Sequence, residues 1–144
     1  MKITFLLTSL ITLTILEYSH SQNEHACMEE LSRELIDVFE TMQACKDEGN
    51  PCPVQCALVL EGATNGGILS AESFSAEIRR RVSPNLAAAL ENLMSGCLVQ
   101  VDGQLTPDSP CELWTGVGGC FVKQTEHVCE GLSRRGRWGR SRFG

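Results

Sequence analysis

Eight cysteines in 144 residues constrain the fold of this chain more than any other feature. An even and high cysteine count is typical of small secreted domains, so we expect four disulfides within one compact domain. Two of the cysteines, in the segment PCPVQCALVL, are four residues apart and share one helical face, so each must reach a different partner segment. The cysteines are Cys27, Cys45, Cys52, Cys56, Cys97, Cys111, Cys120 and Cys129.

The start of the chain has the three regions of a secretory signal peptide. Lys2 supplies a positive charge, residues 5–16 form an apolar stretch, and Ser19-His20-Ser21 precedes a cleavage site at Gln22. The apolar stretch is shorter than the roughly 18 residues that a membrane span needs, and no later stretch is longer, so no membrane insertion is expected. We therefore predict a secreted, extracellular protein with a signal peptide at 1–21, a helical domain at 22–132 and a basic disordered tail at 133–144.

Charge is distributed unevenly along the chain, whose formal net charge is −6. Residues 22–132 carry 17 acidic and six basic residues, a net charge of −11, whereas residues 133–144 carry five arginines and no acidic residue. An acidic body disfavours nucleic acid as a partner. The tail contains the dibasic pair Arg134-Arg135 and ends in Arg-Phe-Gly, so it resembles the precursor of an RFamide-type peptide. Its single copy favours a tail that is disordered and dispensable for folding.

Hydrophobic periodicity predicts an all-α fold of five or six short helices, because no segment alternates as a strand would. Ser70 is expected to cap one helix, and Ser83 with Pro84 to begin the next. The last helix contains Gly116, Gly118 and Gly119, which are expected to weaken it. The predicted helices cover residues 28–44, 52–60, 71–81, 84–97 and 111–128.

The sequence predicts no enzyme, cofactor or metal site. His25 and His127 are the histidines that follow the signal peptide, and neither has a patterned nucleophile or base beside it. A secreted phospholipase A2 would need a His-Asp pair beside its paired cysteines, but Pro-Val-Gln lies between Cys52 and Cys56. The sequence contains no Cys-x2-Cys pair, so the cysteines are not expected to bind a metal ion. His127 is interpreted as a surface histidine rather than a pH trigger. The run Arg79-Arg80-Arg81 is interpreted as a solvated helix face, in preference to a processing site or an anion clamp.

The spacing of five cysteines resembles that of the insect odorant-binding and pheromone-binding protein family. Three residues separate Cys52 from Cys56, forty follow before Cys97, thirteen before Cys111 and eight before Cys120. The segments CPVQCALVLEGATNGGILSAESF and PCELWTGVGGC are similar to the cysteine-bearing helices of that family. The resemblance implies a compact bundle of helices around an apolar cavity, held by three interlocked disulfides. It also implies a carrier of small hydrophobic ligands (odorant, pheromone or lipid-like). Such a carrier is expected to be a monomer or weak dimer, and a membrane receptor is a further candidate partner.

The resemblance leaves the family's first cysteine open between Cys27 and Cys45. Cys27 lies at close to the family's interval before Cys52, whereas Cys45 lies only six residues before it. A continuous helix over 28–44 would separate Cys27 from Cys45 by about 27 Å, and a following antiparallel helix would run beside Cys45. The favoured pairs, implied by the resemblance, are Cys45–Cys56, Cys52–Cys111 and Cys97–Cys120, with Cys27–Cys129 as an added clasp. The competing set exchanges Cys27 and Cys45.

A carrier of this type would line its cavity with apolar side chains from the predicted helices, although the same side chains would also suit a solid core. The alternative hypothesis is a secreted, disulfide-stabilised venom or signalling protein without cargo, whose interior would be solid. The expected ligand-binding residues are Leu35, Val38, Phe39, Met42, Leu58, Phe74, Ile78, Leu90, Leu93, Met94, Leu113, Trp114, Val117 and Phe121.

Overall fold

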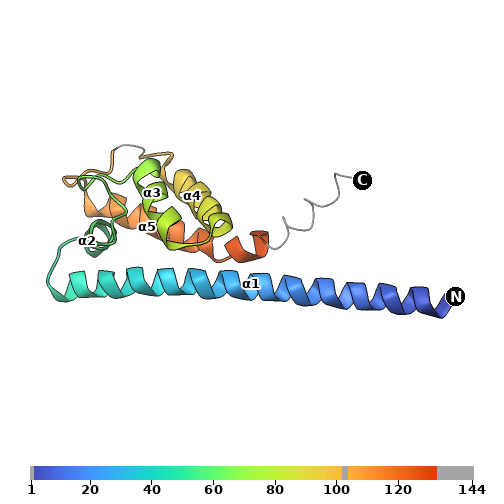
Figure 1. The fold of residues 1–144 in the computed structure, drawn as a ribbon. Coiled ribbons are helices and arrows are strands. Elements are labelled where there is room, and N and C mark those ends of the chain that lie inside the picture. Colours follow the sequence, from blue (N-terminus) through green and yellow to red (C-terminus); the bar gives the residue numbers. More distant parts are fainter. Residues whose placement is uncertain (1, 102–103, 133–144) are drawn as a thin grey trace.

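The computed structural model describes residues 2–101 and 104–132. The predicted disorder and processing of the tail at 133–144 lie outside the described residues. A short helical segment at 128–132 follows the five main helices. These helices are α1 (Lys2–Asp47), α2 (Pro53–Leu60), α3 (Ala71–Arg81), α4 (Pro84–Leu98) and α5 (Cys111–Thr125) (Figure 1).

The all-α class predicted from the sequence is confirmed. Within the described ranges, β pairing is limited to two isolated bridges, Asn65 with Ile68 and Leu69 with Leu105. No helix in the same ranges has a stretch that is long and apolar enough to cross a membrane.

The prediction of short helices is wrong for α1, which continues through 46 residues instead of covering 28–44. Residues 2–47 contain neither glycine nor proline, so nothing interrupts the helical hydrogen bonds before Gly49, whose φ of +78° ends them. The C-terminal half of α1 runs beneath the other helices, and its N-terminal half extends beyond them (Figure 1). Removal of residues 1–21 as a signal peptide stays a prediction.

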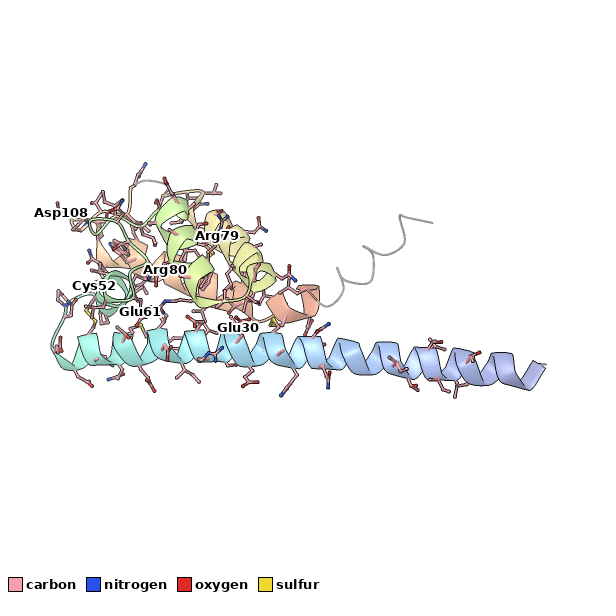
Figure 2. The ribbon with its side chains drawn as sticks, viewed as in Figure 1. Glu30, Cys52, Glu61, Arg79, Arg80 and Asp108 are labelled. Carbon is pink, nitrogen blue, oxygen red and sulfur yellow. A yellow bond between two sulfur atoms is a disulfide. The ribbon has the colours of Figure 1, made fainter. Side chains whose placement is uncertain are left out.

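The shorter helices begin at the residues whose chemistry predicted them. Ser70 caps α3 through a reciprocal pair of hydrogen bonds: its hydroxyl accepts from the Ser73 backbone N–H at 3.1 Å, and its own N–H donates to the Ser73 hydroxyl at 2.9 Å. Pro84 takes the first turn of α4. At the same turn, Glu30 of α1 accepts hydrogen bonds from the Ser83 N–H at 2.5 Å and hydroxyl at 2.8 Å, which ties α1 to the start of α4 (Figure 2).

Four disulfides connect the helices, and they are the four favoured pairs. Cys27–Cys129 and Cys45–Cys56 attach α1 at two places 18 residues apart, and Cys97–Cys120 joins α4 to α5. The competing set, which exchanges Cys27 and Cys45, is not formed. The structure therefore fixes α1 to the rest of the protein by a covalent bond on either side of residues 28–44, in its C-terminal half.

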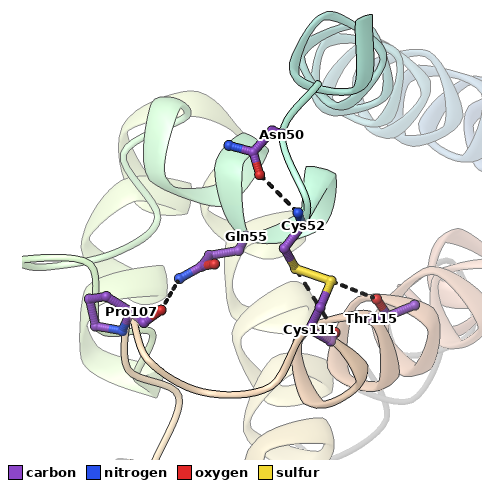
Figure 3. Close-up of a disulfide and its surroundings, with 6 residues drawn as sticks. All are labelled: Asn50, Cys52, Gln55, Pro107, Cys111 and Thr115. Atoms are coloured by element: carbon purple, nitrogen blue, oxygen red, sulfur yellow. Dashed lines mark hydrogen bonds between the residues drawn. A yellow bond between two sulfur atoms is a disulfide. The ribbon is translucent and has the colours of Figure 1, made fainter. Parts of the chain in front are cut away.

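The Cys52–Cys111 disulfide joins the start of α2 to the start of α5, and hydrogen bonds support it (Figure 3). The Cys52 N–H donates to the Asn50 side-chain oxygen at 2.9 Å. The Gln55 side-chain amide donates to the Pro107 carbonyl at 3.1 Å. These bonds hold α2 against the loop that leads into α5, so the two helices have a fixed spacing.

The solid core lies among α3, α4, α5 and the two loops that meet at the Leu69–Leu105 bridge. Leu69, Leu105 and Trp114 are fully buried, and Leu86 and Leu90 nearly so. Burial of large aliphatic and aromatic side chains here is the main source of stability, at about 1.5–3 kcal/mol for each side chain. By contrast, the buried side chains among the described residues of α1 are Leu31 and Cys45.

Candidate ligand-binding cavity

An apolar cavity of about 390 Å³ lies between α1 and the other four helices. All five helices contribute residues to its wall. The backbone of α1 packs closely along α2, whereas its approach to the remaining helices is looser. The cavity occupies the space that this looser approach leaves, and the disulfides at Cys27 and Cys45 keep α1 across it.

Ten of the fourteen expected ligand-binding residues line this cavity. On α1 they recur at steps of three or four residues, which places them on one helical face. Phe74 and Phe121 meet edge to face across the cavity wall, with ring centroids 5.3 Å apart. The ten residues are Leu35, Val38, Phe39, Met42, Leu58, Phe74, Ile78, Leu90, Met94 and Phe121.

The other four expected residues, Leu93, Leu113, Trp114 and Val117, do not line the cavity. Trp114 and Val117 are buried in the solid core, Leu93 packs partly buried against that core, and Leu113 is exposed. Helical periodicity identifies the buried face of α5, but it does not distinguish the part of that face that meets the cavity from the part that packs on α4.

Two glycines of α5, Gly118 and Gly119, also line the cavity, although their position in the sequence predicts only a weaker helix. The helix is continuous from Cys111 to Thr125. A Cβ atom on Gly118 would lie 3.1 Å from a methyl carbon of Val54, so the missing side chain lets α5 approach α2. A Cβ atom on Gly119 would meet nothing within 4 Å, so this position faces open space.

Several further lining residues were missed because their side chains are small, whereas Leu31 was missed although it shares a face of α1 with Leu35. Thr115, Gly119 and Val122 of α5 are exposed, as is Phe39 of α1 opposite, so the cavity opens to the surface between these two helices. The missed uncharged residues are Leu31, Val54, Ala57, Ala63, Thr115, Gly118, Gly119 and Val122.

On the side away from this opening, the cavity is lined by a charged cluster, which we call the Arg81 cluster: Arg81, Glu34, Glu61 and Glu77. Arg81 Nε donates to Glu77 at 2.8 Å, and Arg81 Nη1 lies 3.5 Å from Glu34. Arg81 Nη2 donates to the Glu61 carboxylate at 2.7 Å and to the Glu61 backbone carbonyl at 3.0 Å. The guanidinium therefore connects α1, the end of α2 and α3.

The electrostatics of the Arg81 cluster favour the charged forms of Glu61 and Arg81. Burial raises the pKa of Glu61, but hydrogen bonds from Thr41 and Arg81, and the positive charge of Arg81, bring that pKa below its ordinary value of 4.5. Burial lowers the pKa of Arg81, whereas hydrogen bonds to Glu77 and Glu61 and the charges of Glu61 and Glu34 raise it above its ordinary range.

A second, polar hollow of about 450 Å³ adjoins the apolar cavity at the Arg81 cluster. Three residues of the cluster, Glu34, Glu61 and Arg81, line both spaces. The remaining residues of the polar hollow come from one flank of α1, and they are Asp37, Glu40 and Thr41. One end of the apolar cavity therefore borders a polar surface that is mostly acidic.

The interpretation of Arg79-Arg80-Arg81 as a solvated helix face is wrong for Arg81. Arg79 and Arg80 are exposed, with 68% and 75% of their side-chain surface accessible, whereas Arg81 retains 27%. Arg79 pairs with Glu91 through two contacts of 2.6 and 2.9 Å, which ties α3 to α4. Periodicity could not predict the environment of Arg81, because two of its three partners, Glu34 and Glu61, come from other segments of the chain.

The two histidines that follow the predicted signal peptide lie outside the cavity. His25 and His127 are exposed, and the His127 ring lies 3.7 Å from the Glu130 carboxylate. The described part of the chain contains no group of three or more His, Cys, Asp or Glu side chains arranged to hold a metal ion.

Comparison with known proteins found no relative: no protein-family model, curated protein or solved structure matches this chain.

Proposed function

We propose that this protein is a secreted carrier that binds a small hydrophobic molecule in the cavity between α1 and the other helices, in the manner of the odorant-binding proteins that its cysteine spacing resembles. The observation that carries the proposal is the apolar cavity of about 390 Å³. Ligand sites are commonly apolar spaces of about 300–1,000 Å³ with a few polar groups at one side.

The physical basis of binding is the transfer of an apolar ligand out of water. A ligand that buries about 250 Å² of apolar surface gains about 6 kcal/mol at 25 cal/mol per Å². The loss of translational and rotational freedom on association reduces that gain. Affinities in the micromolar range are therefore expected for neutral molecules that fit the cavity.

The disulfides support this function by holding the cavity wall in place. Without them, α1 could move toward α3 and α5 and bury its apolar face against them, because hydrophobic burial favours collapse of an apolar space. Attachment through Cys27 and Cys45 limits that movement while leaving the opening between Phe39 and Gly119. The alternative hypothesis, a secreted venom or signalling protein without cargo, implies a solid interior, and the volume of the cavity favours the carrier.

The proposal is tested by titrating the protein with a neutral fluorescent apolar probe and then displacing the probe with neutral terpenoids and long-chain alcohols. The protein should be recovered from cells that secrete the full chain, so that its disulfides are formed. We expect saturable binding of one probe per chain. Absence of saturable binding would show the proposal wrong.

Two glycine substitutions on α5 provide a matched pair of variants for this titration. Gly119→Leu adds a side chain at the cavity opening, whereas Gly116→Leu adds the same side chain to the same helix away from the cavity. Each replaces a glycine within a helix and should raise helix stability similarly, by up to about 1 kcal/mol. We expect Gly119→Leu to weaken probe binding by about tenfold or more and Gly116→Leu to leave it unchanged.

A further inference from the structure

Arg81 is the only cation on the wall of either hollow among the described residues, and most of its N–H groups already face an acceptor. Nε donates to Glu77, Nη2 donates to Glu61 through two contacts, and Nη1 faces Glu34. A guanidinium that is surrounded by three carboxylates has little attraction left for an additional anion. Arg81 is therefore unsuited to anchoring the carboxylate of a fatty acid.

Negative charge exceeds positive charge at this end of the cavity. The walls of the two hollows hold five carboxylates, those of Glu34, Asp37, Glu40, Glu61 and Glu77, against the guanidinium of Arg81. Only one of the five, Glu77, has a second cationic partner among the described residues, the exposed Arg80 at 2.9 Å. Two helices also end here, since Glu61 caps the C-terminus of α2 and Arg81 is the last residue of α3. A helix C-terminus carries partial negative charge, which adds to the field of the carboxylates.

The placement of the two hollows suits a ligand that has an apolar body and a charged head. An alkyl chain in the apolar cavity would place a head group at the Arg81 cluster, beside the polar hollow that Asp37 and Glu40 line. Because the polar hollow admits water, the head group keeps part of its hydration and avoids the full cost of burying a charge. The sign of the surrounding charge then decides which head group is favoured.

We propose that the cavity selects hydrophobic ligands with a cationic head group, such as long-chain amines, over ligands of equal length with a carboxylate. This inference rests on the proposed function, because it specifies the class of molecule that the carrier binds.

The test compares three ligands of equal chain length, nonylamine, nonan-1-ol and nonanoate, by displacement of the neutral probe at pH 7 and low ionic strength. At this pH the amine is protonated and the acid is ionised. We expect the amine to bind at least about tenfold more tightly than the carboxylate, with the alcohol between them, because charges a few ångströms apart interact by about a kcal/mol or more. The ratio should fall as salt is added, because salt screens charges that are exposed to solvent.

A matched pair of double variants separates a local effect from the effect of net charge. Asp37→Asn with Glu40→Gln removes two exposed carboxylates from the polar hollow and leaves the Arg81 cluster intact. Glu29→Gln with Glu48→Gln removes one exposed carboxylate within α1 and one directly after it. Neither residue lines either hollow. We expect the first double variant to lower the ratio of amine to carboxylate affinity by about threefold or more and the second to change it little.

The outcomes distinguish this inference from the proposed function. If none of the three ligands displaces the probe, and the probe itself does not bind saturably, the carrier function is wrong and this inference falls with it. If the alcohol binds but the carboxylate binds as tightly as the amine or more tightly, the carrier function stands and the charge selectivity is overturned. Equal effects of the two double variants would also overturn it.

Discussion

Removal of the Cys27–Cys129 disulfide is the perturbation whose effect follows most directly from the structure. The two cysteines are 102 residues apart, but the Cys45–Cys56 and Cys52–Cys111 disulfides shorten the path between them. That path crosses both bridges and includes about 18 residues at each end and about four between the bridges, or about 40 residues in all. A disulfide that closes a loop of about 40 residues lowers the entropy of the unfolded chain, which stabilises the folded state by about 4 kcal/mol at 25 °C. We expect the double variant Cys27→Ser, Cys129→Ser to lose about that much free energy of unfolding.

The same variant should lose ligand binding while it is still folded. Within the described residues, Leu31 and Cys45 are the only buried side chains of α1, and the helix packs closely only along α2, so packing alone holds it weakly against α3 and α5. With Cys129 no longer attached, residues 28–44 can move relative to α3 and α5, and the cavity wall that Leu35 and Phe39 form is displaced. Binding of the neutral probe should weaken by about tenfold or more, which corresponds to about 1.4 kcal/mol.

The matched control is the double variant Cys97→Ser, Cys120→Ser, which removes a disulfide of separation 23 between α4 and α5. This control variant should lose a similar free energy of unfolding, about 3.4 kcal/mol from the entropy of closing its loop in the unfolded chain, and α1 should stay attached. Urea denaturation gives the free energy of unfolding of each variant, and probe titration in the absence of urea gives the affinity. A loss below about 1 kcal/mol for the Cys27–Cys129 variant, together with unchanged probe affinity, would refute this reasoning, because packing would then be holding α1.

Three further predictions concern single side chains. Arg81→Ala should lower the free energy of unfolding by about 2 kcal/mol in urea denaturation, because it leaves three carboxylates facing one another, whereas Arg79→Ala, which breaks an exposed pair, should have a much smaller effect. The folded-state pKa of Glu61 lies below its ordinary value of 4.5, so Glu61 stabilises the protein above about pH 4.5, and this contribution is lost as the pH falls through the folded-state pKa. In Glu61→Gln, the free energy of unfolding should therefore fall less steeply as the pH is lowered. Ser70→Ala removes the cap of α3 and should cost about 1 kcal/mol in the same denaturation assay, and a cost near zero would show that the capping box contributes little.

The boundaries of the helices were predictable where a residue with a strong local preference marks them. Ser70, Pro84 and the Gly-Asn-Pro segment after α1 each impose a local conformation that later packing does not override. The extent of α1 was not predicted, because the absence of glycine and proline from residues 2–47 permits a long helix without requiring one.

The candidate site was predictable only in its apolar part. Periodicity identifies buried faces, and both a cavity residue such as Leu90 and a core residue such as Trp114 satisfy that pattern. The Arg81 cluster could not be predicted, because Glu34, Glu61 and Glu77 come together only when α1, the end of α2 and α3 are packed. Charged side chains at the edge of amphipathic helices are usually exposed, and nothing local distinguishes these.

The measurement that tests the carrier function most directly is the location of a bound neutral ligand by nuclear magnetic resonance. The protein should be labelled at its methyl groups and titrated with nonan-1-ol, and nuclear Overhauser effects between the ligand and the protein should be recorded. We predict contacts to the methyl groups of Leu35, Ile78 and Met94 in the cavity wall, and none to Val99, which is 74% exposed on the surface. Contacts confined to exposed residues such as Val99, or no contacts at a saturating ligand concentration, would contradict the account.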